Sequence, residues 1–566
     1  PGAIDAVKEE AWPQATNSDE LHDALLLSGF ITTKEGNENH WEPYFTELIH
    51  NGRATALEGV HALWIATERV PFFLKAFPDR VLKHPVTVPE KLNQSLTDKD
   101  PLAEIIRGRL EITGPVTARE LSELLDIPVS VVSQALLKLE NEGFVFRGKF
   151  TTAEEEEWCE RRLLARIHRY TIKKLRSEIQ PVSSADYMRF VFRWHRLEKA
   201  NLAQGPTGLE HVLQKLEGYE APAIAWESDI LPPRIAVYDE QWLDMLCVAG
   251  KISWGRFRLS TNTLKDKKAT SPIRTTPVTF IGRNKLNIWT NSPVKSGEVN
   301  DPILSAKAMQ IYDLLKKQGA SFFDDLVYKT KLFPSQAEDA LGELIGAGLI
   351  TSDSFTGLRA LLVPDKYKTN GSHTRDLEIF SMNYAGRWSV LHDQHNDDHQ
   401  HQQESIETIA WALLRRYGIL FRKLSERENL APPWRDLVRV LRTLEARGQI
   451  RGGRFVEGYY GEQFGLPEAI VELRNVKKEN RHDVLISISA ADPLNLTGIM
   501  TPGRRIPAYS GNRVLYRDGV PIAVREANEV QFLVEPEADK KWALQNALIQ
   551  HEVAPRLRKY LGKAVY

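Results

Sequence analysis

A short pattern of leucine, glycine and phenylalanine recurs along this chain at domain-sized intervals. In its clearest copy, Leu136 and Leu139 lie seven and four residues before Gly143, Val145 lies two residues after it, and Phe150 lies seven after it. Leucines at helical spacing followed by glycine indicate the end of a helix, and the residues that follow indicate a strand. Each copy therefore predicts one helix-to-strand junction.

The copies are centred on Gly143, Gly250, Gly348 and Gly448, with a weaker one on Gly52, and their separations are 91, 107, 98 and 100 residues. Solenoid repeats recur roughly every 20–50 residues, so these units are too long for a solenoid. A chain of 566 residues is also too long for one hydrophobic core. We therefore expect a tandem array of domain-sized modules.

The second unit, residues 101–180, predicts a winged helix-turn-helix. Apolar residues at helical spacing up to Leu110 indicate a first helix, and Thr117, three residues before Glu120, has the capping-box spacing that begins a second. Residues 129–141 predict a third helix, and FVFRGKF after it predicts a hairpin with a basic tip. Helix, helix, turn, helix and hairpin is the order of a winged helix.

The third helix of this unit is expected to expose a small, polar face that fits a DNA major groove. That face is formed by Ser130, Ser133, Gln134, Leu137 and Lys138. Winged helices also serve as spacers between proteins, so both readings stay open for each copy. After the hairpin, EEEEWCERRLLARIHRYTIKKLRSEI predicts one helix that runs from acidic to basic, as suits the helix dipole.

The hydrophobic period changes from helical to alternating after Asp483. The segments DVLISIS, RIPAYSGNRVLYRDGVPIAV and VQFLVEP predict short strands, with a tight hairpin turn at Asp518 and Gly519. Such strands predict a small barrel or sheet.

The fold class is mainly α with β, an α+β array of winged-helix modules and a C-terminal β-barrel. We expect five winged helices: a degenerate one over residues 1–100, a second with its following helix over 101–180, a third over 181–264, a fourth over 301–365 and a fifth over 404–480. Between them we expect a basic strand-like linker over 265–300, which could belong to the barrel, and a polar connection over 366–403. The barrel is expected over 481–540 and a C-terminal helix over 541–566.

Composition excludes several classes of protein. The 74 basic and 75 acidic residues give no overall field, so a nucleic-acid site must be a local patch. The two cysteines, Cys159 and Cys247, argue against a disulfide scaffold, and there is no signal peptide and no apolar run of about 18 residues. We therefore expect a cytoplasmic protein without membrane contact. The first residue is Pro1, which suggests a fragment of a longer polypeptide or a tag scar.

Motor and cofactor motifs are missing from the sequence. There is no G-x-x-x-x-G-K-[ST] and no DEAD box, so this chain is not itself an ATPase motor, and HExxH, nucleophile-elbow and G-x-G-x-x-G motifs are absent too. We expect no cofactor. A histidine-rich tract with His392, His395, His399 and His401 could bind a metal, although its low complexity favours disorder.

Two acidic residues are candidates for chemistry. Asp492, in SAADPLNLTGI, follows a predicted strand in an apolar setting, where a carboxylate can have a shifted pKa and serve in acid/base catalysis. An Asx-turn at the strand end is the alternative. Glu227, in AWESDILPPR, is the second candidate, and its alternative is an ion pair with Arg234. For phosphate contacts the candidates lie on two predicted hairpin tips: Arg147, Lys149, Arg451 and Arg454.

Four phrases in order carry a resemblance to a known family. AWESDILPPR, GRWSVL, SAADPLNLTGIMTPG and GNRVLYRDGVPIA together resemble the C-terminal region of the bacterial large helicase-related protein, Lhr. The resemblance implies a helicase core upstream in the same polypeptide, and ATP and Mg would belong to that core. It also implies a build similar to the AlkZ-like DNA glycosylases, with tandem winged helices around a β-barrel, homo-oligomer formation and, in some members, removal of uracil from DNA.

The resemblance thus implies the DNA-binding part of a repair helicase that acts as a monofunctional uracil-DNA glycosylase on single-stranded or forked DNA. Such an enzyme extrudes the base and hydrolyses the N-glycosidic bond with help from a carboxylate. Asp492 is the first choice for that acid and Glu227 the second. The AlkZ-like Q-x-Q or Q-x-D motif is replaced here by residues 217–220, while Gln400-His401-Gln402 is its literal copy. The alternatives are a non-enzymatic DNA-binding and oligomerisation module and, third, a transcription regulator.

Overall fold

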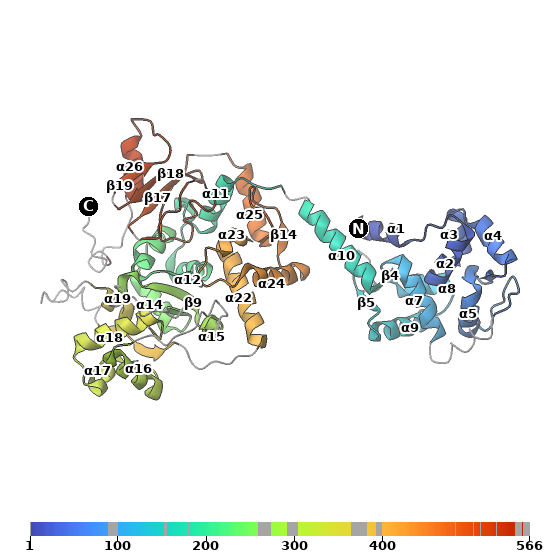
Figure 1. The fold of residues 1–566 in the computed structure, drawn as a ribbon, viewed down its shortest axis with the longest axis horizontal. Coiled ribbons are helices and arrows are strands. Elements are labelled where there is room, and N and C mark those ends of the chain that lie inside the picture. Colours follow the sequence, from blue (N-terminus) through green and yellow to red (C-terminus); the bar gives the residue numbers. More distant parts are fainter. Residues whose placement is uncertain are drawn as a thin grey trace. The chain divides into compact units, whose positions relative to one another are not determined.

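A computed structural model gives the fold of the chain (Figure 1). It describes residues 2–88, 100–151, 155–177, 180–257, 273–290, 304–363, 382–391, 399–480, 483–501, 503–509, 511–527, 529–549 and 557. The chain forms two compact units, Pro1–Glu178 and Ile179–Tyr566. Half of the predicted linker 265–300 and most of the polar connection 366–403, with His392 and His395, lie outside the described residues, as do the side chains of residues 399–402. Where they are described, neither is only a connection: Pro277–Gly282 is a strand of the third module and Arg387–Val390 a strand of the fourth, so those two domain boundaries were wrong.

All five predicted glycine junctions are confirmed. Gly52, Gly143, Gly250, Gly348 and Gly448 have φ angles of 67°, 72°, 69°, 80° and 74°, in the left-handed region that favours glycine. Each ends the third helix of a module, and a strand begins within three residues of it. The repeated pattern is therefore a backbone requirement at the same point of five modules.

The five modules have the same sheet topology. In each one a short strand follows the first helix, a second follows the third helix, and the last strand returns to pair between them, in the orders β1-β3-β2, β4-β6-β5, β7-β9-β8, β10-β12-β11 and β13-β15-β14. Three helices and such a sheet make a winged helix, and the second and third strands form the wing. The predicted array of five winged helices is confirmed, including the first module, which has a complete sheet.

The first unit holds modules 1 and 2. Module 1 comprises α2 (Ser18–Ser28), β1 (Ile31–Thr32), α3 (Thr33–Glu38), α4 (Glu42–His50), β2 (Ala54–Leu57) and β3 (Leu63–Ala66). Module 2 comprises α7 (Pro101–Thr113), β4 (Val116–Thr117), α8 (Ala118–Leu125), α9 (Val129–Asn141), β5 (Val145–Gly148) and β6 (Glu157–Glu160). The predicted capping box of Thr117 and Glu120 begins α8. Helix α5 (Val70–Ala76) packs on α7, and the two modules share one hydrophobic cluster.

The sequence predicted one helix for EEEEWCERRLLARIHRYTIKKLRSEI, and for its first residues that prediction was wrong. Glu157–Glu160 forms β6, the central strand of the sheet, and helix α10 (Arg161–Ser177) begins only after it. The Glu157 carboxylate accepts hydrogen bonds of 2.7 Å from the backbone N–H groups of Phe150 and Thr151. These bonds satisfy the buried acid within the sheet, which the charge pattern alone did not indicate.

The second unit holds modules 3, 4 and 5. Module 3 comprises α12 (Gly205–Lys215), β7 (Ala221–Pro222), α13 (Ala223–Ala225), η3 (Trp226–Ile230), α14 (Glu240–Val248), β8 (Ile252–Gly255) and β9 (Pro277–Gly282). Module 4 comprises α16 (Ala306–Gln318), β10 (Ser321–Phe322), α17 (Phe323–Thr330), α18 (Pro334–Ala347), β11 (Ile350–Ser352) and β12 (Arg387–Val390). Module 5 comprises α22 (His399–Tyr417), β13 (Ile419–Phe421), α23 (Arg422–Ser425), α24 (Trp434–Ala446), β14 (Arg451–Gly453) and β15 (Gln463–Gly465).

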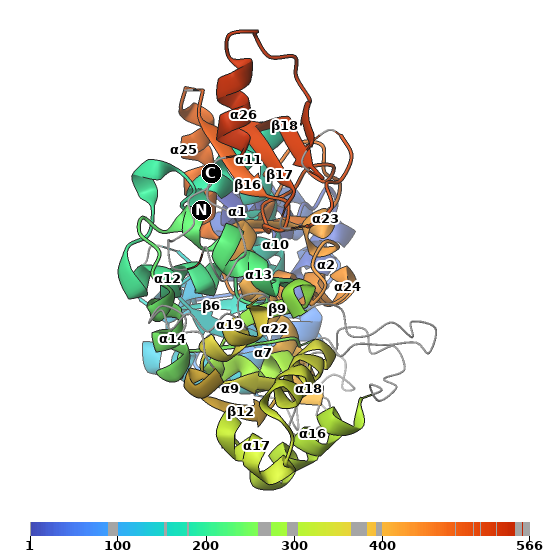
Figure 2. The same ribbon diagram turned by 90° about the vertical axis from the view of Figure 1, so that its left-hand side faces the viewer.

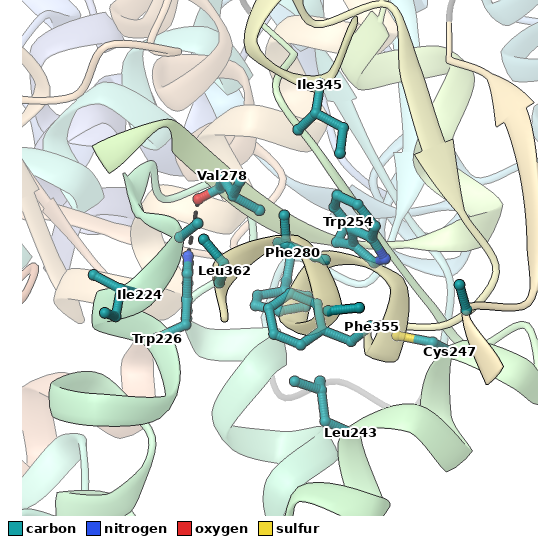
Figure 3. Packing of buried hydrophobic residues seen from close by; sticks show 14 of the residues in the cluster. Ile224, Trp226, Leu243, Cys247, Trp254, Val278, Phe280, Ile345, Phe355 and Leu362 are labelled. Carbon is teal, nitrogen blue, oxygen red and sulfur yellow. Dashed lines mark hydrogen bonds between the residues drawn. The ribbon is translucent and has the colours of Figure 1, made fainter. Parts of the chain in front are cut away.

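Modules 3 and 4 share one aromatic core (Figure 3). The Trp226 and Phe280 rings meet edge to face with centroids 4.8 Å apart, and Trp254 lies between the two modules, 5.8 Å from Phe355 and 6.3 Å from Trp388. The buried Trp226 indole N–H donates to the Val278 carbonyl at 2.9 Å, the dashed line in Figure 3. Wing strands of both modules thus contribute to a common interior.

Helix α11 (Ser184–Trp194), which the sequence placed in module 3, packs against α25 (Pro467–Lys478), which follows module 5. The buried Tyr187 hydroxyl donates to the Tyr417 carbonyl at 3.0 Å, and most of the apolar residues of α11 belong to the core cluster of module 5. Segments of the chain more than two hundred residues apart therefore build this module together.

The C-terminal strands form an antiparallel sheet in the order β16-β17-β18-β19, made of Leu485–Ser489, Arg513–Arg517, Val520–Glu526 and Glu529–Phe532. The predicted turn is confirmed, because Asp518 and Gly519 both have positive φ, at 47° and 82°. Helix α26 (Lys541–Ile549) packs on this sheet, as Figure 2 shows. Among the described residues β16 and β19 are edge strands, so the predicted barrel is seen there as a sheet. No helix in the described part of the chain is long and apolar enough to span a membrane.

Two neighbouring glycines at the end of α18 should respond oppositely to substitution by alanine. Gly348→Ala places a side chain at a φ of 80°, which we expect to lower the free energy of unfolding by at least about 1 kcal/mol. Gly346→Ala lies inside the helix with open space around its new Cβ atom, so it should raise that free energy by up to about 1 kcal/mol. Chemical denaturation followed by circular dichroism measures both. Equal effects of the two variants would contradict the assignment of Gly348 as the helix stop.

Candidate nucleic-acid interface

The segment η3 is a π-helical turn that is buried on every side. Its Leu231 N–H donates to the Trp226 carbonyl at 2.9 Å, and Glu227, Ser228 and Asp229 are all at most 2% exposed. Three consecutive polar residues can be buried only where each finds a partner. The turn therefore depends on groups from other parts of the chain.

Glu227 is held by Arg359 of module 4, not by Arg234. The Arg359 guanidinium donates from Nε and Nη2 to the two carboxylate oxygens at 2.7 and 2.9 Å, and the Tyr238 hydroxyl donates at 2.6 Å. Burial raises the pKa of the Glu227 carboxyl, while Arg359 and Tyr238 act to lower it. Asp244 also pairs with Arg359, so one guanidinium joins two acids of module 3 to module 4.

Asp492 is the partner of Arg234. The Arg234 Nη1 and Nη2 atoms donate to its two carboxylate oxygens at 2.7 and 2.9 Å, and the side chains of the pair are 0% and 1% exposed. One of these oxygens also accepts the Leu494 N–H at 2.9 Å, as an Asx-turn does. The predicted pairing of Glu227 with Arg234 was therefore wrong, and each acid has a guanidinium of its own.

A third buried pair joins the same turn to the C-terminal sheet. In this pair Nη1 of Arg513, on β17, lies 3.3 Å from Oδ1 of Asp229. The two acids proposed for chemistry thus belong to a set of buried ion pairs between modules. In this arrangement the carboxylate oxygens of both acids accept hydrogen bonds from guanidinium and hydroxyl donors, and these bonds stabilise the contacts between the elements.

The predicted phosphate contacts of module 2 differ from those of module 5. Arg147 lies within strand β5, opposite Trp158, and its guanidinium is 3.3 Å from Glu156 and 3.7 Å from Glu140. Lys149 is exposed. Acids on the third helix and the wing therefore neutralise much of the positive charge that the sequence suggested at this position.

In module 5 the predicted arginines join a larger basic face. Arg451 on β14 and Arg454 just after it are exposed, and neither has an acidic partner among the described residues. The exposed side of α24 adds four more arginines, which the sequence analysis missed: Arg435, Arg439, Arg442 and Arg447, the last just beyond the helix end. Their helical spacing in WRDLVRVLRTLEARG was the available signal. We call these six residues the arginine face.

Three members of the arginine face have acidic partners at the surface, and of these Arg442 binds Glu462 through both Nε and Nη2. Arg442 lies 2.8 Å from Glu462, Arg439 lies 3.6 Å from Asp436, and the Arg439 side chain is 65% exposed. Exposed pairs of this kind contribute little free energy and break readily when a stronger anion approaches.

The third helices of the other modules, all within the described residues, lack such a face. Exposed positions of α4 include Glu42 and Glu47, those of α14 and α18 include no lysine or arginine, and α9 exposes Lys138 beside Val131 and Leu137. The third helix is the element that winged helices place in a DNA groove. Among the third helices that the structure describes, that of module 5 therefore has the charge that best suits nucleic acid.

No group of three or more His, Cys, Asp or Glu side chains among the described residues is arranged to hold a metal ion. Of the residues that replace the AlkZ-like motif, Glu217 is buried and pairs with Lys285 at 2.7 Å and Arg415 at 3.3 Å.

Two family models match the chain, and both are described as a winged-helix domain of the large helicase-related protein. One covers residues 182–274 and the other residues 399–485, which correspond to modules 3 and 5. These two modules are therefore winged-helix domains of the Lhr type, and the resemblance found in the sequence is confirmed.

Two relatives align with most of the chain. A protein of Mycolicibacterium smegmatis named Lhr helicase/probable uracil glycosylase is 28% identical over 437 residues, which are 73% of this chain and 27% of that protein. The Escherichia coli Lhr helicase/uracil glycosylase is 25% identical over 447 residues, 72% of this chain and 27% of that protein. The chain thus spans about a quarter of the length of these relatives. The structure of Streptomyces sahachiroi DNA glycosylase AlkZ, 12% identical, has a TM-score of 0.39 and covers 68% of this chain and 98% of that one.

Loss of Asp492 should be costly for stability. Asp492→Ala leaves Arg234 buried without an anion, which we expect to lower the free energy of unfolding by about 3–5 kcal/mol. Replacing both partners by apolar residues, as in Asp492→Leu with Arg234→Met, should recover most of that loss. Chemical denaturation measures the change, with the surface variant Asp436→Ala as the control, expected within about 0.5 kcal/mol of wild type. Equal stability of Asp492→Ala and Asp436→Ala would contradict a structural role.

Proposed function

We propose that this chain is the DNA-binding region of an Lhr-type helicase-related protein and that module 5 holds the DNA. The observation that carries the proposal is the arginine face, which occupies the third helix and wing of a module that matches the Lhr winged-helix family. The helix would enter the major groove, and Arg451 and Arg454 on the wing would contact the flanking phosphates. The helicase core of the same polypeptide and further copies of the chain are proposed partners.

Geometry supports this placement. Arg435, Arg439 and Arg442 follow one another at intervals of four and three residues, so they line one side of α24. A row of guanidinium groups along one helix side matches the row of phosphates that borders a groove, and each pair releases counterions from the DNA. Binding should therefore be strongly dependent on salt.

Removal of the arginine face should weaken DNA binding and flatten its salt dependence. The test variant has Arg435, Arg439, Arg451 and Arg454 all changed to Ala. We expect the negative slope of log K against log salt to become shallower by about 3–4, or about 0.9 per lost phosphate contact. Fluorescence anisotropy with a labelled duplex at several salt concentrations measures it. The matched control is Arg147→Ala with Lys149→Ala in module 2, for which a smaller change is expected because Glu140 and Glu156 already neutralise Arg147. An unchanged slope in the quadruple variant would overturn the proposal.

We further propose that the DNA held in this way is a substrate for uracil removal, as the names of the two relatives suggest. In such a reaction a water oxygen bonds to C1′ of the deoxyribose, the N-glycosidic bond breaks, and the protons of the water are shared between the sugar hydroxyl and the released base. Asp492, or second Glu227, is the proposed acid that orients the water or stabilises the cationic sugar. Either would act only after DNA binding opens its pair with Arg234 or Arg359.

A non-enzymatic module that grips DNA for the helicase is the second candidate function. One observation favours it: both proposed acids are buried and already satisfied by guanidinium donors. The two functions differ in whether this chain changes the DNA covalently.

Incubation with uracil-containing single-stranded DNA, followed by alkali, separates the two functions. A glycosylase leaves an abasic site that alkali converts to a break, and we expect breaks at uracil with the wild-type chain and fewer with the quadruple arginine variant. No breaks with the wild-type chain would favour the non-enzymatic module.

Asp492 itself is tested by the paired substitution Asp492→Leu with Arg234→Met, whose fold should be preserved. Catalysis by Asp492 predicts that this variant is inactive despite native stability. Full activity in it would assign Asp492 to the fold alone.

A further inference from the structure

The tip of the module 5 wing carries an aromatic side chain in open water. Tyr460, between β14 and β15, is 89% exposed, the largest exposed fraction of any large hydrophobic residue that the structure describes. It lies between Gly458 and Gly461, which have φ angles of 81° and 90° and open space where a Cβ atom would be. The turn therefore projects one ring beyond the rest of the wing.

The wing beneath this ring is firmly held. The Gln463 side chain is fully buried, accepts the backbone N–H groups of Phe455 and Val456 at 2.9 Å each, and donates to the Val456 and Tyr459 carbonyls at 2.9 and 3.3 Å. A buried amide with four hydrogen bonds fixes the loop that leads to the tip.

Tyr459 anchors the other side of the tip. Its hydroxyl donates to the Met500 carbonyl at 2.9 Å, and its ring packs on Phe421 with centroids 4.8 Å apart. Of two adjacent tyrosines, one is tied into the fold and the other points away from it. An aromatic ring on a rigid mount loses little further freedom when it is inserted between other rings.

We infer that Tyr460 is a wedge that inserts into the base stack of bound DNA. The inference rests on the proposed DNA binding by module 5 and adds the part of the site that unstacks bases. Wing arginines Arg451 and Arg454 bring the tip to the phosphate backbone, and the exposed phenol ring is then adjacent to bases on which it can stack. A wedge of this kind lowers the cost of base extrusion, because the ring replaces the stacking contacts that the departing base loses.

The balance of charge on this helix and wing favours nucleic acid over a protein partner. Arg442, Arg451 and Arg454 belong to the same third helix and wing. Of the two acids in the turn, Glu462 is bound to Arg442 and Glu457 is exposed. Module 4 has an aromatic side chain of nearly equal exposure, Tyr328 at 83%, on the second helix of its motif rather than on a wing. It provides a matched control.

The experiment uses the whole chain and DNA duplexes in which 2-aminopurine replaces adenine at one position after another. Its fluorescence rises when its neighbours unstack, whether or not a base is later removed. We expect a rise at one step with the wild-type chain and with Tyr460→Phe, and none with Tyr460→Ala. DNA affinity should fall roughly 5- to 150-fold in Tyr460→Ala, the range expected for one aromatic stacking contact, with the salt slope unchanged because no phosphate contact is lost. Tyr328→Ala should behave as wild type.

The outcomes separate this inference from the proposed function. A fluorescence rise that persists in Tyr460→Ala, or a wild-type chain that binds DNA with no rise at any position, overturns the wedge and leaves DNA binding standing. A wild-type chain that does not bind the duplexes overturns both. Equal loss of the signal in Tyr328→Ala also contradicts the inference. The Tyr460 side chain is 89% exposed, so its removal should leave the melting temperature unchanged. Melting temperatures equal to that of the wild-type chain in Tyr460→Ala and Tyr328→Ala would confirm that folded proteins are being compared.

Discussion

Buried guanidinium–carboxylate pairs around the π-helical turn Trp226–Ile230 hold the second unit together. From this turn and the residues just after it, Glu227 reaches Arg359 of module 4, Asp229 reaches Arg513 of the C-terminal sheet, and Arg234 reaches Asp492 in the loop after β16. Each pair links elements more than a hundred residues apart in the chain. Removal of a single partner would leave an unpaired charge in the interior, so the pairs also define which surfaces can meet.

This arrangement gives the five similar modules different roles. Modules 3 and 4 contribute their wing strands to one aromatic core, and their third helices contain no lysine or arginine. Module 5 instead packs against α11 and α25, while the arginines of its third helix and wing stay exposed. The five modules thus share one architecture, and among their described third helices that of module 5 exposes a row of arginines.

The candidate site could be predicted only in part from the sequence. Arg451 and Arg454 were found because they follow the repeat, and they are exposed as expected. Arg147, on the wing of module 2, instead faces Glu140 of the third helix α9 and Glu156 just before β6. Asp492 was singled out correctly as an acid in an apolar setting, yet its partner Arg234 was assigned to Glu227, the nearer acid along the chain. Proximity in sequence is a poor guide to ion pairing in a protein of several modules.

What the sequence determined by itself is the local backbone: five glycine junctions, the capping box at Thr117 and Glu120, and the hairpin turn at Asp518 and Gly519. These depend on residues within a few positions of one another, whose backbone preferences act in any surroundings. Tertiary structure decided which acid meets which arginine, which arginines stay exposed and where α11 packs. Those outcomes depend on burial and on contacts between distant segments, and a charge pattern does not specify them until the modules are packed.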